Sequence, residues 1–344
     1  MSRKEGEIDS IFSGLFAKDE PGAAVLVMRG DSIIYDRGFG IADMETGKPI
    51  TGDTMFNIAS VSKQFSAVAA MKLAEEGKLS LGDPVSKYFP QFEAKFFKCI
   101  TLKNLLSHTS GIPDARPRDD FDFITTATDE ESYYYMKYLD HLNFDPGTRY
   151  EYINPTFQLF YTIVPRCSGI PFEKYMKEKI FVPASMPRAV YFEAGKRIED
   201  AAHGYRYDSS AGWRKFEYGE EPFFATKADG GIYTSTREFV NWEKALRKCT
   251  VITAEDRDEM QDEKIMISDM PFTGYGYGWF IERKPGYPKK VFHTGNNGGF
   301  QIFAGMFPDC GILYLIFANR DDWDREAVVS EFDTLMEEAG WLSR

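Results

Sequence analysis

The sequence predicts an α+β fold: an antiparallel β-sheet built from N- and C-terminal strands and flanked by helices, with a mostly helical second lobe. Strand-like runs lie near both ends of the 344-residue chain, and helical patterns with Pro- and Gly-rich loops fill its middle. Late strands must therefore pair with early ones across a long insertion. We expect residues 1–83 and 226–344 to form the sheet lobe and residues 84–225 the helical lobe. A ligand cleft is expected between them.

The first elements predict a helix followed by a hairpin. Residues 4–17 have the pattern of a short amphipathic helix. Two strand-like runs follow, Ala23–Arg29 and Ser32–Arg37, and Gly30-Asp31 between them is typical of a tight turn.

A buried helix is predicted over residues 60–76, because most of its residues from Ala67 to Ala74 are apolar and Gly77 follows as a stop signal. The polar stretch Arg116–Glu131 is expected to be a surface excursion. Further helical patterns occupy residues 132–141, 155–168 and 171–179.

Strand character returns after the turn residues Gly230-Gly231. Helices are expected at residues 236–248 and 323–340. Three late runs are typical of strands: Tyr277–Glu282, Gly299–Phe307 and Ile312–Asn319.

Composition narrows the class of partner. With 41 Lys and Arg against 53 Asp and Glu, the net charge of −12 argues against nucleic acid or an anionic membrane. The four cysteines form no C-x-x-C and the four histidines no H-E-x-x-H, so we expect no metal or cofactor. The partner is expected to be a small molecule or short peptide, and the oligomeric state stays open.

Membrane and targeting signals are not evident in the sequence. No run approaches eighteen apolar residues, so no membrane span is expected. The N-terminus lacks the apolar segment of a signal peptide. The chain as written is therefore expected in the cytoplasm, or in the periplasm or outside the cell if a signal segment has been removed.

The first candidate for chemistry is Ser60-Val-Ser-Lys63, at the start of the predicted buried helix. Residues three apart share a helix face, so the Ser60 hydroxyl and the Lys63 amine can meet. Serine needs a neighbouring base to become a nucleophile, and a desolvated lysine has a lowered pKa that suits this task. Ser62 points away from Lys63 and is the weaker candidate.

Two further polar groups follow along the chain. Tyr152 and Asn154 lie two residues apart on an extended loop, so both side chains point to one side, where tyrosine can relay a proton and asparagine can bind an amide. His293-Thr294-Gly295 ends a strand-like run and precedes Asn296, and its glycine permits close approach of a ligand or backbone. Each motif alone also fits an ordinary structural role.

Taken together, S-x-x-K, Y-x-N and H-T-G resemble the motif set of the serine β-lactamase and penicillin-binding protein (DD-peptidase) superfamily. The chain looks most like the branch with class C β-lactamases, DD-carboxypeptidases, D-aminopeptidases and family VIII esterases. The likeness covers about residues 10–320. Supporting stretches are Phe56–Lys63, Gly77–Asp83, Leu105–Pro113 and Gly230–Ser235.

The resemblance implies a β-lactamase/transpeptidase-like fold and a serine hydrolase that works through an acyl-enzyme. It implies Ser60 as nucleophile, Lys63 as proton acceptor and Tyr152 as general base or relay. Which of the last two is the acylation base stays open.

For binding, the resemblance implies that Asn154 holds the substrate amide. His293 and Thr294 would bind a carboxylate end of the substrate, at the strand edge that continues through Gly295. The backbone N–H groups of Ser60 and Asn296 would form the oxyanion hole. His108 is expected to be structural.

His293 stands where many β-lactamases have lysine, and this weakens the case for an anionic β-lactam. If His293 pairs with a substrate carboxylate, affinity should rise as the pH falls through about 6.5. The leading function is an esterase or a D-amino-acid peptidase or carboxypeptidase. The alternatives are a true class C-type β-lactamase, or a protein that binds penicillin or peptide without turnover. An α/β-hydrolase is disfavoured because no G-x-S-x-G occurs.

Overall fold

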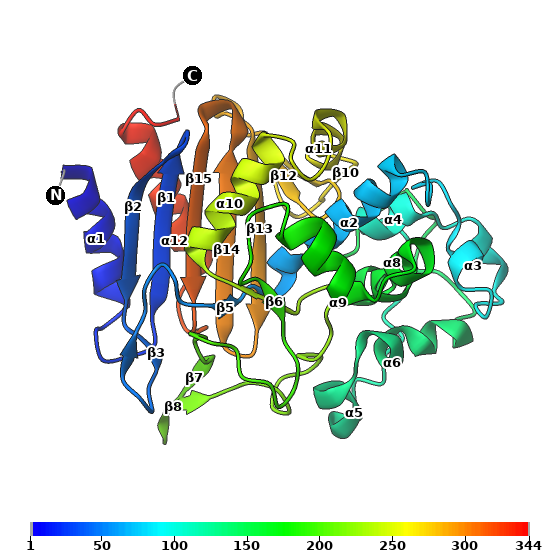
Figure 1. The fold of residues 1–344 in the computed structure, drawn as a ribbon, viewed down its shortest axis with the longest axis horizontal. Coiled ribbons are helices and arrows are strands. Elements are labelled where there is room, and N and C mark those ends of the chain that lie inside the picture. The colour runs from blue at the N-terminus through cyan, green and yellow to red at the C-terminus, as the bar shows by residue number, and fades with distance from the viewer. Residues whose placement is uncertain (1–2, 343–344) are drawn as a thin grey trace.

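The computed structural model describes residues 3–342, so the outermost positions of the predicted sheet lobe, 1–2 and 343–344, lie outside it. An eight-stranded antiparallel sheet forms the centre of the fold, in the order β10-β11-β12-β13-β14-β15-β1-β2 (Figure 1). The strands are β1 (Ala23–Arg29), β2 (Ser32–Phe39), β10 (Ile265–Met266), β11 (Thr273–Tyr275), β12 (Phe280–Glu282), β13 (Lys290–Asn297), β14 (Phe300–Phe307) and β15 (Ile312–Ala318).

The pairing of β1 with β15 joins the two ends of the chain, and it runs without interruption from Ala23↔Ala318 to Arg29↔Ile312. Every residue of β15 is buried, as its continuous apolar run requires in a strand covered on both faces. The predicted antiparallel sheet from early and late strands is therefore confirmed.

Helices cover both faces of this sheet (Figure 1). On one face, α1 (Arg3–Leu15) and α12 (Arg325–Glu338) pack an apolar layer in which the rings of Phe12 and Tyr314 each form a T-shaped contact with Phe332. On the other face lie α10 (Thr236–Arg247) and α2 (Lys63–Glu75). The α2 helix is buried on almost every side, as its apolar sequence predicts, and the chain leaves it through Gly77 at a φ of +66°.

Short helices occupy most of the middle of the chain. Figure 1 shows them gathered beside the β12–β13 side of the sheet, with α2 between. They are α3 (Val85–Tyr88), α4 (Leu102–Leu106), α5 (Phe121–Thr126), α6 (Asp129–Tyr134), α7 (Asn154–Gln158), α8 (Phe160–Ser168) and α9 (Phe172–Tyr175), with α11 (Ala254–Met260) later in the chain. Single 3-10 or π turns cover Ala59–Ser62, Lys95–Lys98, Tyr135–Tyr138, Met176–Phe181 and Pro308–Cys310.

Three small sheets complete the fold. They pair β3 (Ile41–Asp43) with β4 (Lys48–Pro49), β5 (Phe56–Asn57) and β6 (Val190–Tyr191) with β9 (Ile232–Thr234), and β7 (Tyr205–Asp208) with β8 (Gly212–Lys215). Of these, β5–β9 matters for the site, because it ties the segment just before Ser60 to the Gly230-Gly231 turn. The predicted division into lobes at 83/84 and 225/226 stays a prediction.

Several local expectations need correction. The predicted helix 132–141 is α6 plus a 3-10 turn. The predicted 155–168 helix is interrupted at Leu159, between α7 and α8, and Pro155 lies in the first turn of α7. Arg116–Glu131 is not a simple surface excursion. It contains all of α5 and the start of α6, and both Arg116 and Asp129 are buried. Among residues 3–342, no helix has the length and apolar character needed to cross a bilayer.

Candidate active site

Ser60 lies in a turn whose backbone is strained at the preceding residue. Ser60 lies in the 3-10 turn Ala59–Ser62 that leads into α2. Ala59 has a φ of 46°, a left-handed conformation that alanine rarely adopts, and the Asn57 side chain accepts the Ala59 N–H at 2.8 Å. Such strain persists where the surroundings over-determine it, and it is common beside reactive groups. Ser62 instead accepts a hydrogen bond from the Ile232 N–H and is fully buried.

Lys63 sits at the centre of the site with three oxygens around its amine. Its Nζ lies 3.0 Å from Ser60 Oγ, 2.8 Å from Asn154 Oδ1 and 3.0 Å from the Asp229 carbonyl oxygen. The ammonium form uses its three N–H donors on these three partners. The carbonyl and amide oxygens can only accept, so a neutral Lys63 keeps both of those bonds and turns its lone pair to Ser60. The Ser60 hydroxyl is the one partner here that can give Lys63 a proton.

Burial adjusts the pKa of Lys63 so that it can exchange a proton with Ser60. Its side chain is completely buried, and this desolvation lowers the pKa to about 8. The negative charge of Asp229 opposes the change, and the positive charge of Arg116 adds to it. The lysine can therefore release and accept a proton near neutral pH.

Tyr152 faces the same serine. Its hydroxyl is buried and makes no hydrogen bond of normal geometry to the residues the structure describes, but it lies near enough to the Ser60 hydroxyl to interact with it. Burial raises the Tyr152 pKa well above its usual value, and the Ser60 hydroxyl partly offsets this rise. The Lys63 ammonium lies 4.9 Å from the centre of the Tyr152 ring. Tyr152 is therefore a neutral phenol whose proton is free to be donated.

Asn154 differs from its predicted role in one respect. Its amide oxygen is engaged by Lys63, so only its Nδ2 group is left to donate to a substrate carbonyl. Binding of the substrate amide by Asn154 stays a prediction, now limited to this donor.

The strand β13 lines the site from the sheet side. β12 pairs only with Lys290–Phe292, so from His293 to Asn297 the backbone on that side has no partner among the described strands. Gly295 allows the close approach expected of it: an added Cβ would lie 2.6 Å from the Ile58 carbonyl oxygen and 3.2 Å from Ser60 N. The strand is thereby pressed against the backbone of the predicted nucleophile.

The surroundings of His293 argue against the carboxylate pairing expected of it, which stays a prediction. Only 1% of the residue is exposed, and its Nδ1 lies 2.6 Å from the Thr294 carbonyl oxygen. That oxygen can only accept, so Nδ1 carries the proton and Nε2 accepts from the Tyr275 hydroxyl at 2.9 Å. Burial, reinforced by the charge of Lys63, lowers the His293 pKa to about 3. A buried neutral ring does not titrate near 6.5, so the expected pairing with a carboxylate is not supported.

His108 has the structural role expected of it. Its Nδ1 accepts the Ile153 N–H at 3.2 Å and its carbonyl accepts the Glu151 N–H at 2.9 Å, so it fixes the backbone on both sides of Tyr152. The two rings lie 4.2 Å apart.

Two residues that complete this arrangement were not identified from the sequence. Asp229 directly precedes the Gly230-Gly231 turn, a signal that a backbone carbonyl would be placed there. Tyr275 lies between Gly274 and Gly276, in a glycine-rich stretch that lets its ring approach β13.

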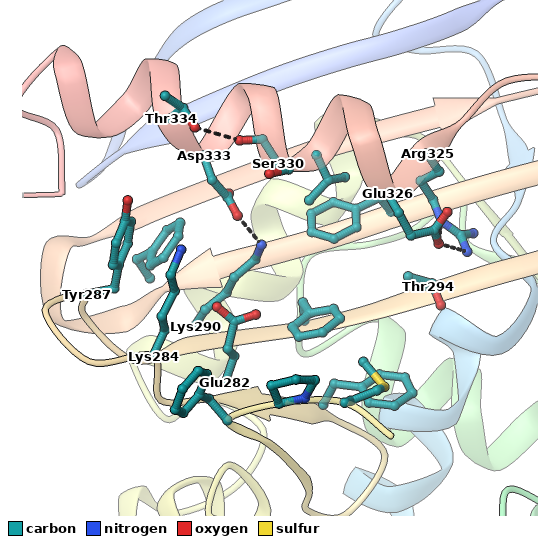
Figure 2. Close-up of a pocket in the computed structure, with 18 residues that line it drawn as sticks. Glu282, Lys284, Tyr287, Lys290, Thr294, Arg325, Glu326, Ser330, Asp333 and Thr334 are labelled. Atoms are coloured by element: carbon teal, nitrogen blue, oxygen red, sulfur yellow. Dashed lines mark hydrogen bonds and ion pairs between the residues drawn. The ribbon is translucent and has the colours of Figure 1, made fainter. Parts of the chain in front are cut away.

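A cavity of about 580 Å3 opens on the other face of β13, beneath α12 (Figure 2). Aromatic rings line it, and Lys290 pairs with Asp333 inside it. Ser60, Lys63 and Tyr152 do not line this cavity, but the predicted site residue Thr294 does. Arg325 lies at this end (Figure 2) and donates to the Gly295 carbonyl at 3.3 Å and to Asn296 Oδ1 at 2.9 Å, which fixes the end of β13 from behind.

The sheet-and-helix fold, with a serine and a buried lysine under one strand edge, defines a protein of the serine acyl-transfer type. Comparison of the sequence with family models matches residues 8–333 to the Beta-lactamase family. The chain belongs to this family, and the predicted superfamily is thereby confirmed.

Individual relatives agree. The chain is 25% identical over 335 residues to penicillin-binding protein 4* of Bacillus subtilis, which covers 93% of this chain and 72% of that protein. It is 26% identical to protein flp of Staphylococcus aureus, where the match covers 91% of this chain and 62% of the relative. The chain thus spans less than two thirds of the length of flp.

Solved structures show the same fold. An octameric penicillin-binding protein homologue from Pyrococcus abyssi superposes with a TM-score of 0.82 at 26% identity, over 99% of this chain and 77% of that chain. A D-amino acid amidase from Ochrobactrum anthropi, complexed with L-phenylalanine amide, gives a TM-score of 0.81 at 22% identity, over 98% of this chain and 97% of that one.

Proposed function

We propose that this chain is a serine hydrolase that cleaves an ester or amide through an acyl-enzyme on Ser60. One observation carries the proposal: Lys63 has two neighbours that can only accept and one, the Ser60 hydroxyl, that can donate. With its pKa lowered to about 8, the lysine is neutral often enough near neutral pH to act as a base.

The proposed acylation begins with a proton transfer between Ser60 and Lys63. The Ser60 proton passes to Lys63 Nζ as Oγ forms a bond to the substrate carbonyl carbon. The carbonyl oxygen becomes an oxyanion, which the backbone N–H groups of Ser60 and Asn296 are proposed to stabilise. The bond from carbon to the leaving oxygen or nitrogen then breaks, and the leaving group takes a proton.

We assign the proton donor for that step to Tyr152. Its raised pKa keeps it protonated, and its hydroxyl faces Ser60. Lys63 can then return the proton it holds to Tyr152. In deacylation the roles reverse: a water loses a proton to the same pair, its oxygen attacks the acyl carbon, and Ser60 Oγ leaves as the hydroxyl.

For the substrate we propose a neutral amide or ester of an amino acid, before a β-lactam or a peptide with a free carboxylate. The buried, uncharged His293 does not supply the cation that a carboxylate requires, and the Lys290 ammonium on the same strand is already paired with Asp333. The neighbour of the same fold is a D-amino acid amidase solved with L-phenylalanine amide, and an amino acid amide is a neutral substrate of this kind, which supports the choice. Peptidase and carboxypeptidase specificities remain proposals of the second rank.

A substrate panel tests this proposal. Wild type and Ser60→Ala would be incubated with D- and L-phenylalanine amide, a p-nitrophenyl ester, a chromogenic cephalosporin and a D-Ala-D-Ala peptide. Steady turnover of the amide or ester that disappears in Ser60→Ala is the expected result. Preferred turnover of the cephalosporin would make the chain a β-lactamase instead. Stoichiometric labelling without turnover would make it a penicillin- or peptide-binding protein. Turnover that survives in Ser60→Ala would overturn the site.

A further inference from the structure

Two carboxyl groups, Asp129 and Asp229, are buried together behind Lys63. They are 1% and 6% exposed, and the Asp229 carboxyl accepts a hydrogen bond from the Gln158 side chain at 3.3 Å. Burial, reinforced by the charge of Asp229, raises the pKa of Asp129 well above its usual value. Burying like-charged groups together is unfavourable, so the hydrogen bonds that these groups accept have to offset the cost.

Asp129 uses both of its oxygens on the backbone of one short segment. Oδ2 accepts the Lys227 N–H at 2.7 Å, and Oδ1 accepts the Ala228 N–H at 2.9 Å. This segment, residues 227–229, ends in the carbonyl that receives Lys63. A carboxylate that accepts two consecutive N–H groups fixes the orientation of both peptide planes.

The same segment is held from the α2 side. The Ser66 hydroxyl donates to the Ala228 carbonyl at 2.5 Å, and the Lys63 amine donates to the Asp229 carbonyl at 3.0 Å. Ser66 and Lys63 lie three residues apart on one face of α2. The segment 227–229 is therefore fixed between a carboxylate from α6 and two donors from α2.

We propose that Asp129 is a positioning residue for acylation: it fixes the segment 227–229 so that the Asp229 carbonyl keeps the Lys63 lone pair directed at Ser60. The inference rests on the proposed function of Lys63. It gives the Arg116–Glu131 region a part in the reaction, because Asp129 contributes to the geometry of a lysine that it does not touch.

The consequences differ from those of a purely structural residue. In Asp129→Asn the amide nitrogen faces a backbone N–H and cannot accept it, so one of the two bonds is lost. The Asp229 carbonyl then holds Lys63 less well. Since this bond is strongest to the ammonium, its loss lowers the Lys63 pKa, and the poorer aim of the lone pair lowers the maximal rate.

The test measures acylation of Ser60 by a p-nitrophenyl ester, as the burst of p-nitrophenolate and the mass of the acyl-enzyme, from pH 6 to pH 10. Asp129→Asn is expected to lower the limiting acylation rate at least about tenfold, a loss of about 1.4 kcal/mol. The pH at which the acylation rate of Asp129→Asn is half-maximal should lie at least about 0.5 pH units below that of wild type. The ester concentration at half-maximal rate should stay within about twofold.

Asp208→Asn is the matched control. Asp208 also accepts two consecutive backbone N–H groups, from Ser210 at 2.8 Å and Ala211 at 3.0 Å, but in the β7–β8 turn. This variant should keep both the rate and the midpoint.

If Asp129→Asn does not fold, Ser66→Ala tests the inference instead, because it removes the hydrogen bond that α2 donates to the Ala228 carbonyl. It should shift rate and midpoint in the same direction.

Wild-type rate and midpoint in a folded Asp129→Asn or, failing that, in Ser66→Ala would overturn the inference, even if thermal stability fell. Failure of the wild-type protein to acylate Ser60 at all would instead overturn the proposed function.

Discussion

The pH dependence of acylation separates Lys63 from Tyr152 as the base. With a pKa of about 8, Lys63 is neutral in about 9% of molecules at pH 7 and in about 91% at pH 9. An ordinary lysine would be neutral in only about 0.03% at pH 7. Burial therefore increases the active fraction at pH 7 about 300-fold, since each pKa unit is a factor of ten.

We expect the second-order acylation rate to rise about tenfold from pH 7 to pH 9 and then to level off. The sign follows from the base being the deprotonated form, which accumulates as the pH rises through 8. If Tyr152 had to be a phenolate, its raised pKa would make the rate climb beyond pH 10 with no plateau.

The assay is stopped-flow release of p-nitrophenolate under single-turnover conditions, with circular dichroism to confirm that the protein stays folded at each pH. Tyr152→Phe should lower the plateau and keep the midpoint near 8, and Lys63→Arg should abolish acylation. A profile that is flat from pH 6 to pH 9, or a midpoint that moves by more than about one pH unit in Tyr152→Phe, would refute the assignment of Lys63.

Three further predictions concern β13 and its neighbours. Because the pKa of His293 is lowered to about 3, KM for an anionic substrate should not change between pH 5 and pH 8; a fall in KM below pH 6.5 would restore the carboxylate-binding role. Tyr275→Phe removes the donor to His293 Nε2 and should lower the free energy of unfolding by about 1–2 kcal/mol in urea titrations, whereas no change would mean that the bond is not formed. Gly295→Ala would place a Cβ 2.6 Å from the Ile58 carbonyl oxygen, so kcat/KM should fall at least about 100-fold in a folded protein; a loss under about threefold would show that the strand can move away freely.

Much of the sheet could be predicted from the sequence because its strands carry strong local signals. The apolar run of β15 predicts a buried strand, and Gly30-Asp31 predicts the tight turn between β1 and β2. The order of the elements then requires early and late strands to pair. The short strands β10 and β11 were not predicted, because two or three residues carry too little periodicity.

In the site, too, local contacts could be predicted from the sequence and contacts between distant segments could not. The Ser60–Lys63 contact depends on spacing within one turn, so the sequence was sufficient to predict it. The neutral state of His293 depends on Tyr275 and on burial beneath neighbouring rings, which are contacts between distant segments. Asp129 was placed on the surface because a charged stretch usually lies there. Its two backbone bonds to residues about a hundred positions later overrode that preference.

The most direct test of the central claim is the mass of the protein trapped during turnover. Wild type would be mixed with a p-nitrophenyl ester or D-phenylalanine amide, quenched in acid within milliseconds and digested for peptide mapping. The account predicts that one acyl group is attached, on the peptide that contains Ser60, and that the adduct is missing in Ser60→Ala. An acyl group on another residue, or turnover with no adduct in either protein, would contradict it.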